Sequence, residues 1–348
     1  MTLELMVIRH AKSIINSDET IIGGRHPRAP LDILGIRQSV LLGMRLNQDQ
    51  VMCNKIYSAP LLRHRQTAEI VGDIAGYEPS KIEYVNALSE IDYGEAEGKK
   101  KKDVLNTTEL QKAFYRNPDF RIAENAQTYR ECADEISSWI REEIIPQYEA
   151  NGRKRLLLIS SSKRITALYQ RCLRQNLRNR RIEEKFDNTS ISILEYKNDK
   201  TEKRQWYRIV ANDFTHLSPA FQMSMKNSVK YSETLKKYIE RYLPDEESTK
   251  PSDIERLKSM KNILEGLERD IYVNIIIEKF VNAPIEDIIK FLKGLPDPKH
   301  ARAHLEEILG FYSDEEEDNS KKSRLIDPRN PIIVLDVLKR FMLGYNKL

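Results

Sequence analysis

Short apolar runs alternate with longer amphipathic stretches through the first part of the chain. Five runs rich in aliphatic and β-branched residues predict strands at residues 3–8, 55–58, 156–160, 190–196 and 205–210. Between them, apolar residues at helical spacing predict helices at 33–46, 63–75, 126–148 and 165–173. This alternation predicts a three-layer α/β/α sandwich with a mainly parallel sheet, in which ligands bind at the carboxyl ends of the strands.

The pattern changes after Pro219, where strand signals almost vanish. Apolar residues at helical spacing predict further helices at 221–243, 254–267, 271–280, 285–295 and 332–343. The acidic segment at 313–318 predicts an exposed loop between the last two. We therefore expect two domains, an α/β domain over residues 1–218 and an all-helical region over residues 219–348.

Length and composition fit a two-domain protein without a membrane or nucleic-acid role. The chain has 348 residues, more than one domain of ordinary size, and its 40% of hydrophobic residues suffice for packed cores. A net charge of +4 is too modest to indicate nucleic acid, and no apolar stretch approaches the ~20 residues of a membrane span. Cys53, Cys132 and Cys172 have no paired spacing, which favours reduced thiols and a cytoplasmic location.

Arg9 and His10 stand side by side at the end of the first predicted strand. A guanidinium group grips phosphoryl oxygens through a rigid fork of donors, and a neutral imidazole can attack phosphorus. The pair could therefore bind one phosphoryl group and react with it. Alone the dipeptide is weak evidence, because most such pairs are ordinary surface residues.

Four further segments, in order along the chain, strengthen the phosphate interpretation: Gly24-Arg25, then 30–38, 57–68 and 88–98. Together with Arg9-His10 and Asn16, they resemble the histidine phosphatase superfamily in its phosphoglycerate-mutase-like branch. The resemblance extends over residues 1–218. The ordered set is specific, although no single motif is.

The resemblance implies roles for individual residues. His10 matches the nucleophile that becomes phosphohistidine, and Arg9 and Arg63 match the arginines that hold the phosphate. Asn16 matches an amide that contacts the same group, and Glu90 matches the acid that protonates the leaving group. No metal or organic cofactor is implied. Such a set suits a phosphoryl transfer in two steps.

Arg25 is a further candidate for substrate binding.

The chain departs from the family pattern at the end of the strand predicted over residues 156–160. The family usually has a second histidine followed by glycine there, but this chain has Ser161 and Ser162. A serine donates a hydrogen bond without positive charge, so the change could cost about 100- to 1000-fold in rate while phosphate binding survives. Lys163 and the neighbouring Arg164 could supply replacement cations from the start of the next helix.

His216 is another residue that could compensate for the serine, although a structural role in the closing segment is the simpler interpretation. The lysine run at 99–102 lies where the family has its variable lid and could line an entrance for a polyanionic substrate; a solvated surface is the alternative. His300 and His304 have a spacing that can bind a metal, but a chance pair is the better interpretation.

Two functions from different classes remain open. The first is a phosphohydrolase that cleaves a phosphomonoester through phosphohistidine, which the joint retention of His10 and Glu90 favours. The second is a pseudo-phosphatase that binds a phosphorylated ligand and acts as a regulatory or interaction module, which Ser161 favours. A mutase is a weaker third option. For residues 219–348 we expect self-association or a protein partner, with docking onto the catalytic domain as the alternative.

Overall fold

A computed structural model describes residues 2–17, 20–148, 153–178, 186–198, 205–226, 228–243 and 258–267. Several predictions lie outside these residues: the helices at 271–280, 285–295 and 332–343, the acidic loop at 313–318, and the pair of His300 and His304. Within the described part of the chain, no helix is both long and apolar enough to cross a membrane.

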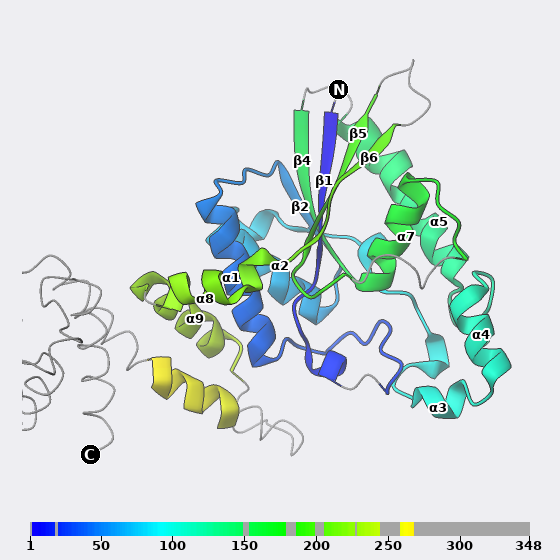
Figure 1. Ribbon diagram of the computed structural model, residues 1–348, viewed down its shortest axis with the longest axis horizontal. Helices are drawn as coiled ribbons and strands as arrows, with labels where there is room; N and C mark the ends of the chain where they lie inside the picture. The colour runs from blue at the N-terminus through cyan, green and yellow to red at the C-terminus, as the bar shows by residue number, and fades with distance from the viewer. Residues whose placement is uncertain are drawn as a thin grey trace, which may run out of the picture. The chain divides into compact units, whose positions relative to one another are not determined.

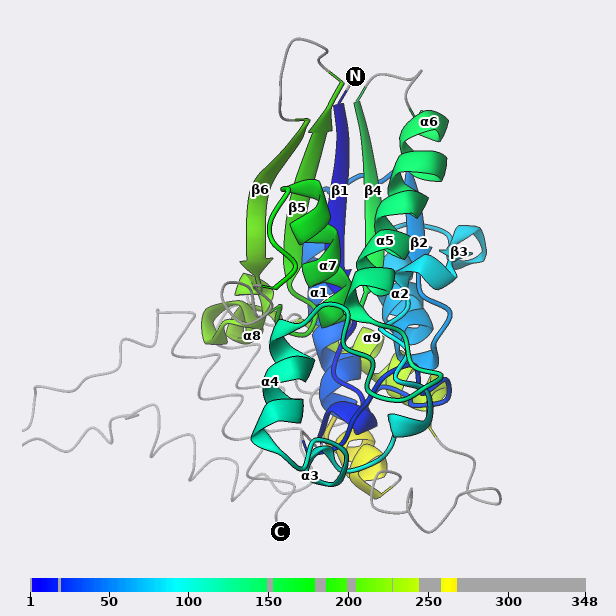
Figure 2. The ribbon, with the colours of Figure 1, turned by 90° about the vertical axis from the view of Figure 1, so that its right-hand side faces the viewer.

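A mostly parallel sheet of six strands organises the α/β part of the molecule (Figures 1 and 2). Its order is β3-β2-β4-β1-β5-β6, and only β5 runs antiparallel to its neighbours, β1 and β6; the other five strands share one direction. The strands are β1 (Thr2–Arg9), β2 (Lys55–Ser58), β3 (Glu83–Tyr84), β4 (Arg153–Ser160), β5 (Ile191–Lys197) and β6 (Trp206–Asp213). Five of them match predicted strands, and β3 is an addition two residues long.

Helices cover both faces of this sheet, which confirms the predicted three-layer sandwich. α1 (Ile33–Gln48) and α2 (Leu62–Ile74) cover one face, and α5 (Tyr129–Trp139), α6 (Ile145–Tyr148) and α7 (Ser162–Cys172) cover the other. α3 (Lys101–Val104) and α4 (Thr108–Arg116) lie past the carboxyl end of β1, and α8 (Pro219–Lys226) follows β6 in the chain. Figure 2 looks onto the face covered by α5 and α7, with α1 and α2 behind the sheet.

The alternation along β1 supplies a core to each face. Leu3 and Leu5 belong to a buried cluster that includes Ile136 of α5, whereas Met6 and Ile8 pack in a second cluster with Leu42 of α1. A strand that is buried on both faces lies near the centre of a parallel sheet. The residues just after β1 are therefore held by protein on every side.

The helix predicted over residues 126–148 is interrupted in the structure. A capping box between Thr128 and Glu131 starts α5 at Tyr129, and a wider π turn over Ile140–Ile144 separates α5 from α6. Helical periodicity does not reveal such a turn, because the apolar residues on both sides keep almost the same spacing.

By its contacts, the chain divides into two units: Met1–Met225 with Arg241–Arg256, and Lys226–Glu240 with Leu257–Leu348. In the first, α8 contacts α1 through a hydrogen bond of 3.1 Å from Arg37 Nη2 to Gln222 Oε1. The second holds α9 (Val229–Arg241) and a helix over residues 258–267. A domain boundary at residue 218 and a partner for residues 219–348 stay predictions.

Candidate active site

His10 follows β1 directly and is held by hydrogen bonds on two sides. Its backbone N–H donates to Ser160 O at 2.9 Å, and its carbonyl oxygen accepts from Asn188 Nδ2 at 2.7 Å. Its ring Nδ1 lies 2.7 Å from Ala11 O. Because a carbonyl oxygen only accepts, Nδ1 carries the hydrogen and Nε2 keeps the lone pair.

The surroundings keep this imidazole neutral. The His10 side chain is almost fully buried, and its pKa lies well below the ordinary value because of burial and the nearby charges of Arg63 and Arg9. A neutral ring with its lone pair on Nε2 is the form of histidine that can act as a nucleophile.

Arg63 lies in the first turn of α2 and faces His10. Its Nε is 3.3 Å from His10 Nε2, and its two terminal nitrogens donate to the carbonyl oxygens of His26 and Gly24 at 3.0 Å each. Burial lowers its pKa to about 10, so the guanidinium is still charged at neutral pH. The side chain is therefore fixed with its charge beside the reactive nitrogen.

Gly24 permits the close turn that accepts the hydrogen bond from Arg63. Its φ is +66°, and a Cβ there would stand 2.0 Å from Oε1 of Glu97. The Glu97 carboxylate accepts from the backbone of Arg25 and from that of Tyr93 at 3.1 Å. Only glycine therefore lets this loop approach the segment around Tyr93.

Arg9 brings a second guanidinium to the same place. Its Nη1 donates to Phe186 O at 2.7 Å, whereas its Nε is buried and has no hydrogen-bond partner among the described residues. Buried donors are rarely left unpaired in native structures. This nitrogen has almost no accessible surface, so Arg9 contributes to the cavity through the rest of its side chain and through its charge.

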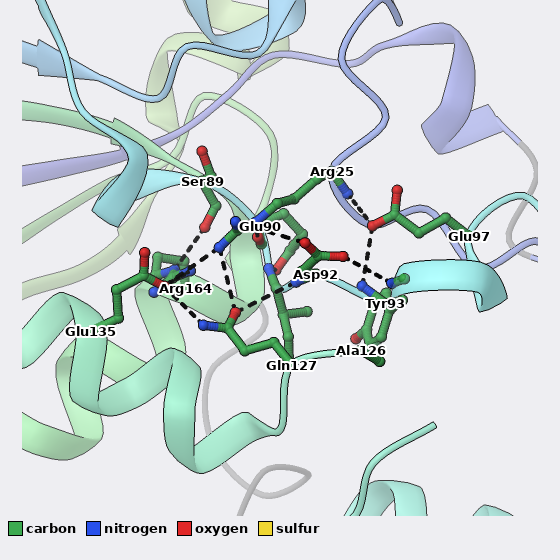
Figure 3. A network of polar contacts seen from close by, with 12 residues as sticks. Arg25, Ser89, Glu90, Asp92, Tyr93, Glu97, Ala126, Gln127, Glu135 and Arg164 are labelled. Carbon is green, nitrogen blue, oxygen red and sulfur yellow. Dashed lines mark hydrogen bonds and ion pairs between the residues drawn. The ribbon is translucent and has the colours of Figure 1, made fainter. Parts of the chain in front are cut away.

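Glu90 lies on a loop that two buried or half-buried arginines clamp in place (Figure 3). Arg25 Nε donates to Glu90 O at 2.9 Å, and Arg164 Nε donates to Ser89 O at 2.6 Å. Both guanidiniums also pair with Glu135 Oε2, at 3.4 and 3.0 Å respectively. This network fixes the backbone of Glu90, and its Oε1 in turn accepts from Ile91 N at 2.9 Å.

These groups open into a cavity of about 650 Å³. Arg9, His10, Arg63, Glu90 and Lys163 all line it, so five of the predicted site residues come together. We call His10, Arg9 and Arg63 the inner group, because Arg63 donates to the His10 ring and Arg9 directly precedes His10. Farther out, the described lining includes three lysines and two aromatic residues, which we call the outer group: Lys12, Lys101, Lys163, Tyr93 and Phe114.

Lys163 is positioned by the aromatic pair. Its ammonium lies 4.5 Å from the ring centroid of Tyr93 and 5.1 Å from that of Phe114. Lys101 comes from the lysine run, and Lys12 stands 3.8 Å from Asp32 with its side chain about one-third exposed. The outer group therefore combines three positive charges with two aromatic rings.

The other predicted site residues are placed differently. Arg25 belongs to the network around Glu90 and does not line the cavity, and neither does Ser161 or Ser162. The Ser162 carbonyl accepts from Thr166 Oγ1 at 2.9 Å, within α7. The side chain of Asn16 lies outside the description. Arg164 and His216, which we considered as compensating groups, do not line the cavity either.

His64 is the residue next to the nucleophile that sequence reasoning missed. It is fully buried in the first turn of α2, its ring centroid is 4.5 Å from that of His10, and its Nε2 is 2.7 Å from Ser161 Oγ. A signal was present, because His64, Ala68 and Val71 share the buried helical stripe of α2. That spacing predicts burial, but it does not identify the neighbour.

The family model of the histidine phosphatase superfamily (branch 1) matches residues 5–209. The chain belongs to this superfamily. A search of curated proteins finds no match. Membership supports phosphohydrolase activity in general, in agreement with the cluster of basic side chains around His10.

Solved structures share the fold. The mycobacterial glucosyl-3-phosphoglycerate phosphatase is 19% identical, with 61% of this chain and 99% of that chain covered and a TM-score of 0.53. The phosphoglycerate mutase from Bacillus anthracis is 19% identical, with 62% and 95% covered and a TM-score of 0.51. A phosphoserine phosphatase variant from Entamoeba histolytica, solved with phosphoserine, is 18% identical, with 62% and 100% covered and a TM-score of 0.50.

Proposed function

We propose that the protein is a phosphohydrolase that cleaves a phosphomonoester through a phosphohistidine on His10. The observation that carries this proposal is the orientation of the His10 ring. Its Nδ1 donates to Ala11 O, so the lone pair is on Nε2, which accepts a hydrogen bond of 3.3 Å from Arg63 Nε and faces a cationic cavity. Superfamily membership and the phosphatases of the same fold support the same class of reaction.

The first step transfers the phosphoryl group to the enzyme. His10 Nε2 forms a bond to phosphorus while the bond from phosphorus to the ester oxygen breaks, and Glu90 gives its proton to the departing oxygen. Arg63 and Arg9, which both line the cavity, stabilise the charge on the phosphoryl oxygens. The products are an alcohol and phosphohistidine.

The second step returns the enzyme to its starting state. Water attacks phosphorus, Glu90 takes a proton from that water, and the bond from phosphorus to Nε2 breaks. Inorganic phosphate leaves and His10 is again a neutral imidazole. The low pKa of His10 favours this step, because a weakly basic imidazole is a good leaving group.

The charges of the cavity favour a substrate with a second anionic group. Among the described residues, the lining has five basic side chains against Glu90 and Asp187, an excess of three positive charges. One phosphate dianion neutralises two of these. The outer lysines would then bind a carboxylate or a second phosphate on the same molecule.

A binding module without turnover is the second candidate. The observation that favours it is that His10 is the one histidine in the described lining of the cavity, because Ser161 lies behind it in contact with His64. Such a protein would bind a phosphorylated ligand through the inner group, and no phosphohistidine would accumulate or turn over.

One experiment separates the two candidates. We expect the full-length protein to hydrolyse p-nitrophenyl phosphate and to carry a phosphoryl adduct, detected by intact-mass spectrometry after rapid denaturation at alkaline pH. His10→Ala and His10→Gln should abolish both signals, because neither side chain has a nucleophilic ring nitrogen. Hydrolysis that persists in both variants would contradict the proposal, and phosphate binding without turnover in the unmodified protein would favour the binding module.

A further inference from the structure

A buried histidine that the proposed mechanism does not use lies directly against the nucleophile. The rings of His64 and His10 meet edge to face, with an interplanar angle of 61° and centroids 4.5 Å apart. His64 is fully buried and does not line the cavity, so it cannot touch a substrate held at His10 Nε2. Whatever it contributes to the reaction passes through His10.

Ser161 holds His64 in this position and gives up another interaction to do so. It occupies the N-cap of α7, where a serine hydroxyl ordinarily accepts a hydrogen bond from the backbone of the first turn. Here the side chain makes no capping hydrogen bond, and its Oγ lies 2.7 Å from His64 Nε2. The hydroxyl is directed away from its own helix toward the histidine.

The first two turns of α2 thus place three side chains around the reactive segment. Arg63 contacts the His10 ring at Nε2, His64 contacts its side, and Thr67 Oγ1 accepts from the backbone N–H of Ala11 at 3.1 Å. Spacings of three and four residues place these groups on one face of the helix. His64 supplies the contact that prevents the His10 ring from rotating out of line.

We propose that His64, anchored by Ser161, is a positioning residue that fixes the ring of His10 for attack on phosphorus. The family resemblance leads us to expect an imidazole at position 161, just after β4. In this protein an imidazole does lie beside that position, but it belongs to His64 of α2 and contacts the His10 ring instead of the substrate. The low pKa of His64, caused by burial and by the nearby charges of Arg63 and Arg9, keeps it neutral and compatible with that contact. The inference rests on the proposed function.

A second buried pair provides a matched control. His216 is also fully buried, its Nε2 lies 2.9 Å from the hydroxyl of Thr189, and its Nδ1, like that of His64, has no partner among the described residues. His216 makes no described ring contact with His10. Replacing His64 or His216 by alanine therefore removes a buried imidazole that is hydrogen-bonded to a hydroxyl group. Only His64→Ala also removes a ring that contacts His10.

The test compares His64→Ala, Ser161→Ala and His216→Ala in the full-length protein. With p-nitrophenyl phosphate, we expect His64→Ala to lower kcat by about 10- to 100-fold, because small misplacements of a reacting group are costly, and to leave KM almost unchanged. Ser161→Ala should lower kcat by a smaller factor. His216→Ala should reduce the melting temperature and keep the kcat of the unmodified protein.

A second readout needs no turnover. Long-range ¹H–¹⁵N spectra of histidine-labelled protein report which ring nitrogen of His10 carries the proton, and the His10 signals are assigned by their loss in His10→Ala. We expect the Nδ1–H form in the unmodified protein and in His216→Ala, but a mixture of tautomers in His64→Ala. This result would hold even if the protein proved to be a binding module, so the two proposals can fail separately.

The proposal is overturned if His64→Ala keeps both the kcat and the His10 spectrum of the unmodified protein, as His216→Ala should. If His64→Ala does not fold, His64→Gln and Ser161→Ala take its place. The first retains an amide that can bond Ser161 but loses the ring contact, and the second retains the ring and loses its anchor. Unchanged His10 spectra in both of these variants would equally overturn the proposal.

Discussion

The inner and outer groups of the cavity hold their cations in different ways. Arg63 is buried and makes hydrogen bonds to two backbone carbonyl oxygens, so its position is set by the fold itself. Lys163 lies over aromatic rings, and Lys12 is about one-third exposed beside a carboxylate. A rigid inner group suits a reaction common to all substrates, whereas an outer group of flexible side chains suits recognition of one substrate class.

The contrast predicts that changes to the inner group affect every substrate. Arg63→Ala removes a fixed charge beside the phosphoryl oxygens, and we expect kcat/KM to fall by about 100- to 1000-fold on alkyl and aryl phosphates alike. Arg63→Lys should recover only part of this loss, because an ammonium lacks the planar fork. Steady-state kinetics on both substrate types provide the measurement.

Arg65→Ala is the matched control for this prediction. Arg65 is in the same turn of α2, but it is exposed and stacks on the ring of Tyr84 at 4.4 Å. A loss of activity in Arg65→Ala as large as that in Arg63→Ala would mean that helix α2 is simply intolerant of substitution, and the inner group would lose its special status.

Glu90 should show an effect that depends on the leaving group. Glu90→Gln removes the proton donor, and we expect a fall of about 100-fold with an alkyl phosphate in kcat/KM, which reports the first step and not the hydrolysis of phosphohistidine. With p-nitrophenyl phosphate the loss should be small, because nitrophenolate leaves without protonation. Glu95→Gln, an exposed neighbour on the same loop, serves as the control. Equal losses on both substrates would contradict an acid role for Glu90.

Periodicity sufficed to predict the sheet and the main helices because their apolar residues repeat over long stretches. Five strands and the three-layer arrangement follow from runs such as that of β1, which alternates between two cores. No comparable pattern predicts β3, which has two residues, or α4, whose Phe114 lines the cavity. Short elements bury too little to leave a pattern.

The motifs were sufficient to predict several residues of the candidate site. They did not predict the orientation of the side chains. Lys163 and Arg164 are adjacent, and a helix turns about 100° between them, so one lines the cavity and the other is buried beneath the Glu90 loop. The partners of Arg164 are carbonyl oxygens of Ser89 and Cys132, which lie 75 and 32 residues away in sequence. The hydrophobic and polar pattern around Arg164 does not predict acceptors so distant in sequence.

His64 shows that the sequence also failed to predict which residue occupies the space beside Ser161. The sequence suggested Ser161→His as a way to restore a missing imidazole and to raise the rate. In the structure Ser161 and His64 are both almost fully buried and in contact, so a histidine at 161 would compete with His64 for the same space. An added imidazole at this position therefore makes sense only together with a smaller residue at position 64.

The smallest predicted effect concerns the outer group and is confined to one class of substrate. Lys101→Ala should raise KM about tenfold for a phosphomonoester that carries a carboxylate or a second phosphate, because one charge-assisted hydrogen bond is lost at a partly open site. For a neutral alkyl phosphate of the same size, KM should stay the same, and kcat should be unchanged for both. Lys102→Ala is the control, since Lys102 is exposed on the same short helix and does not line the cavity. If Lys101→Ala and Lys102→Ala raise KM equally, the lysine run acts through long-range attraction, and the outer group is no binding site for a second anion.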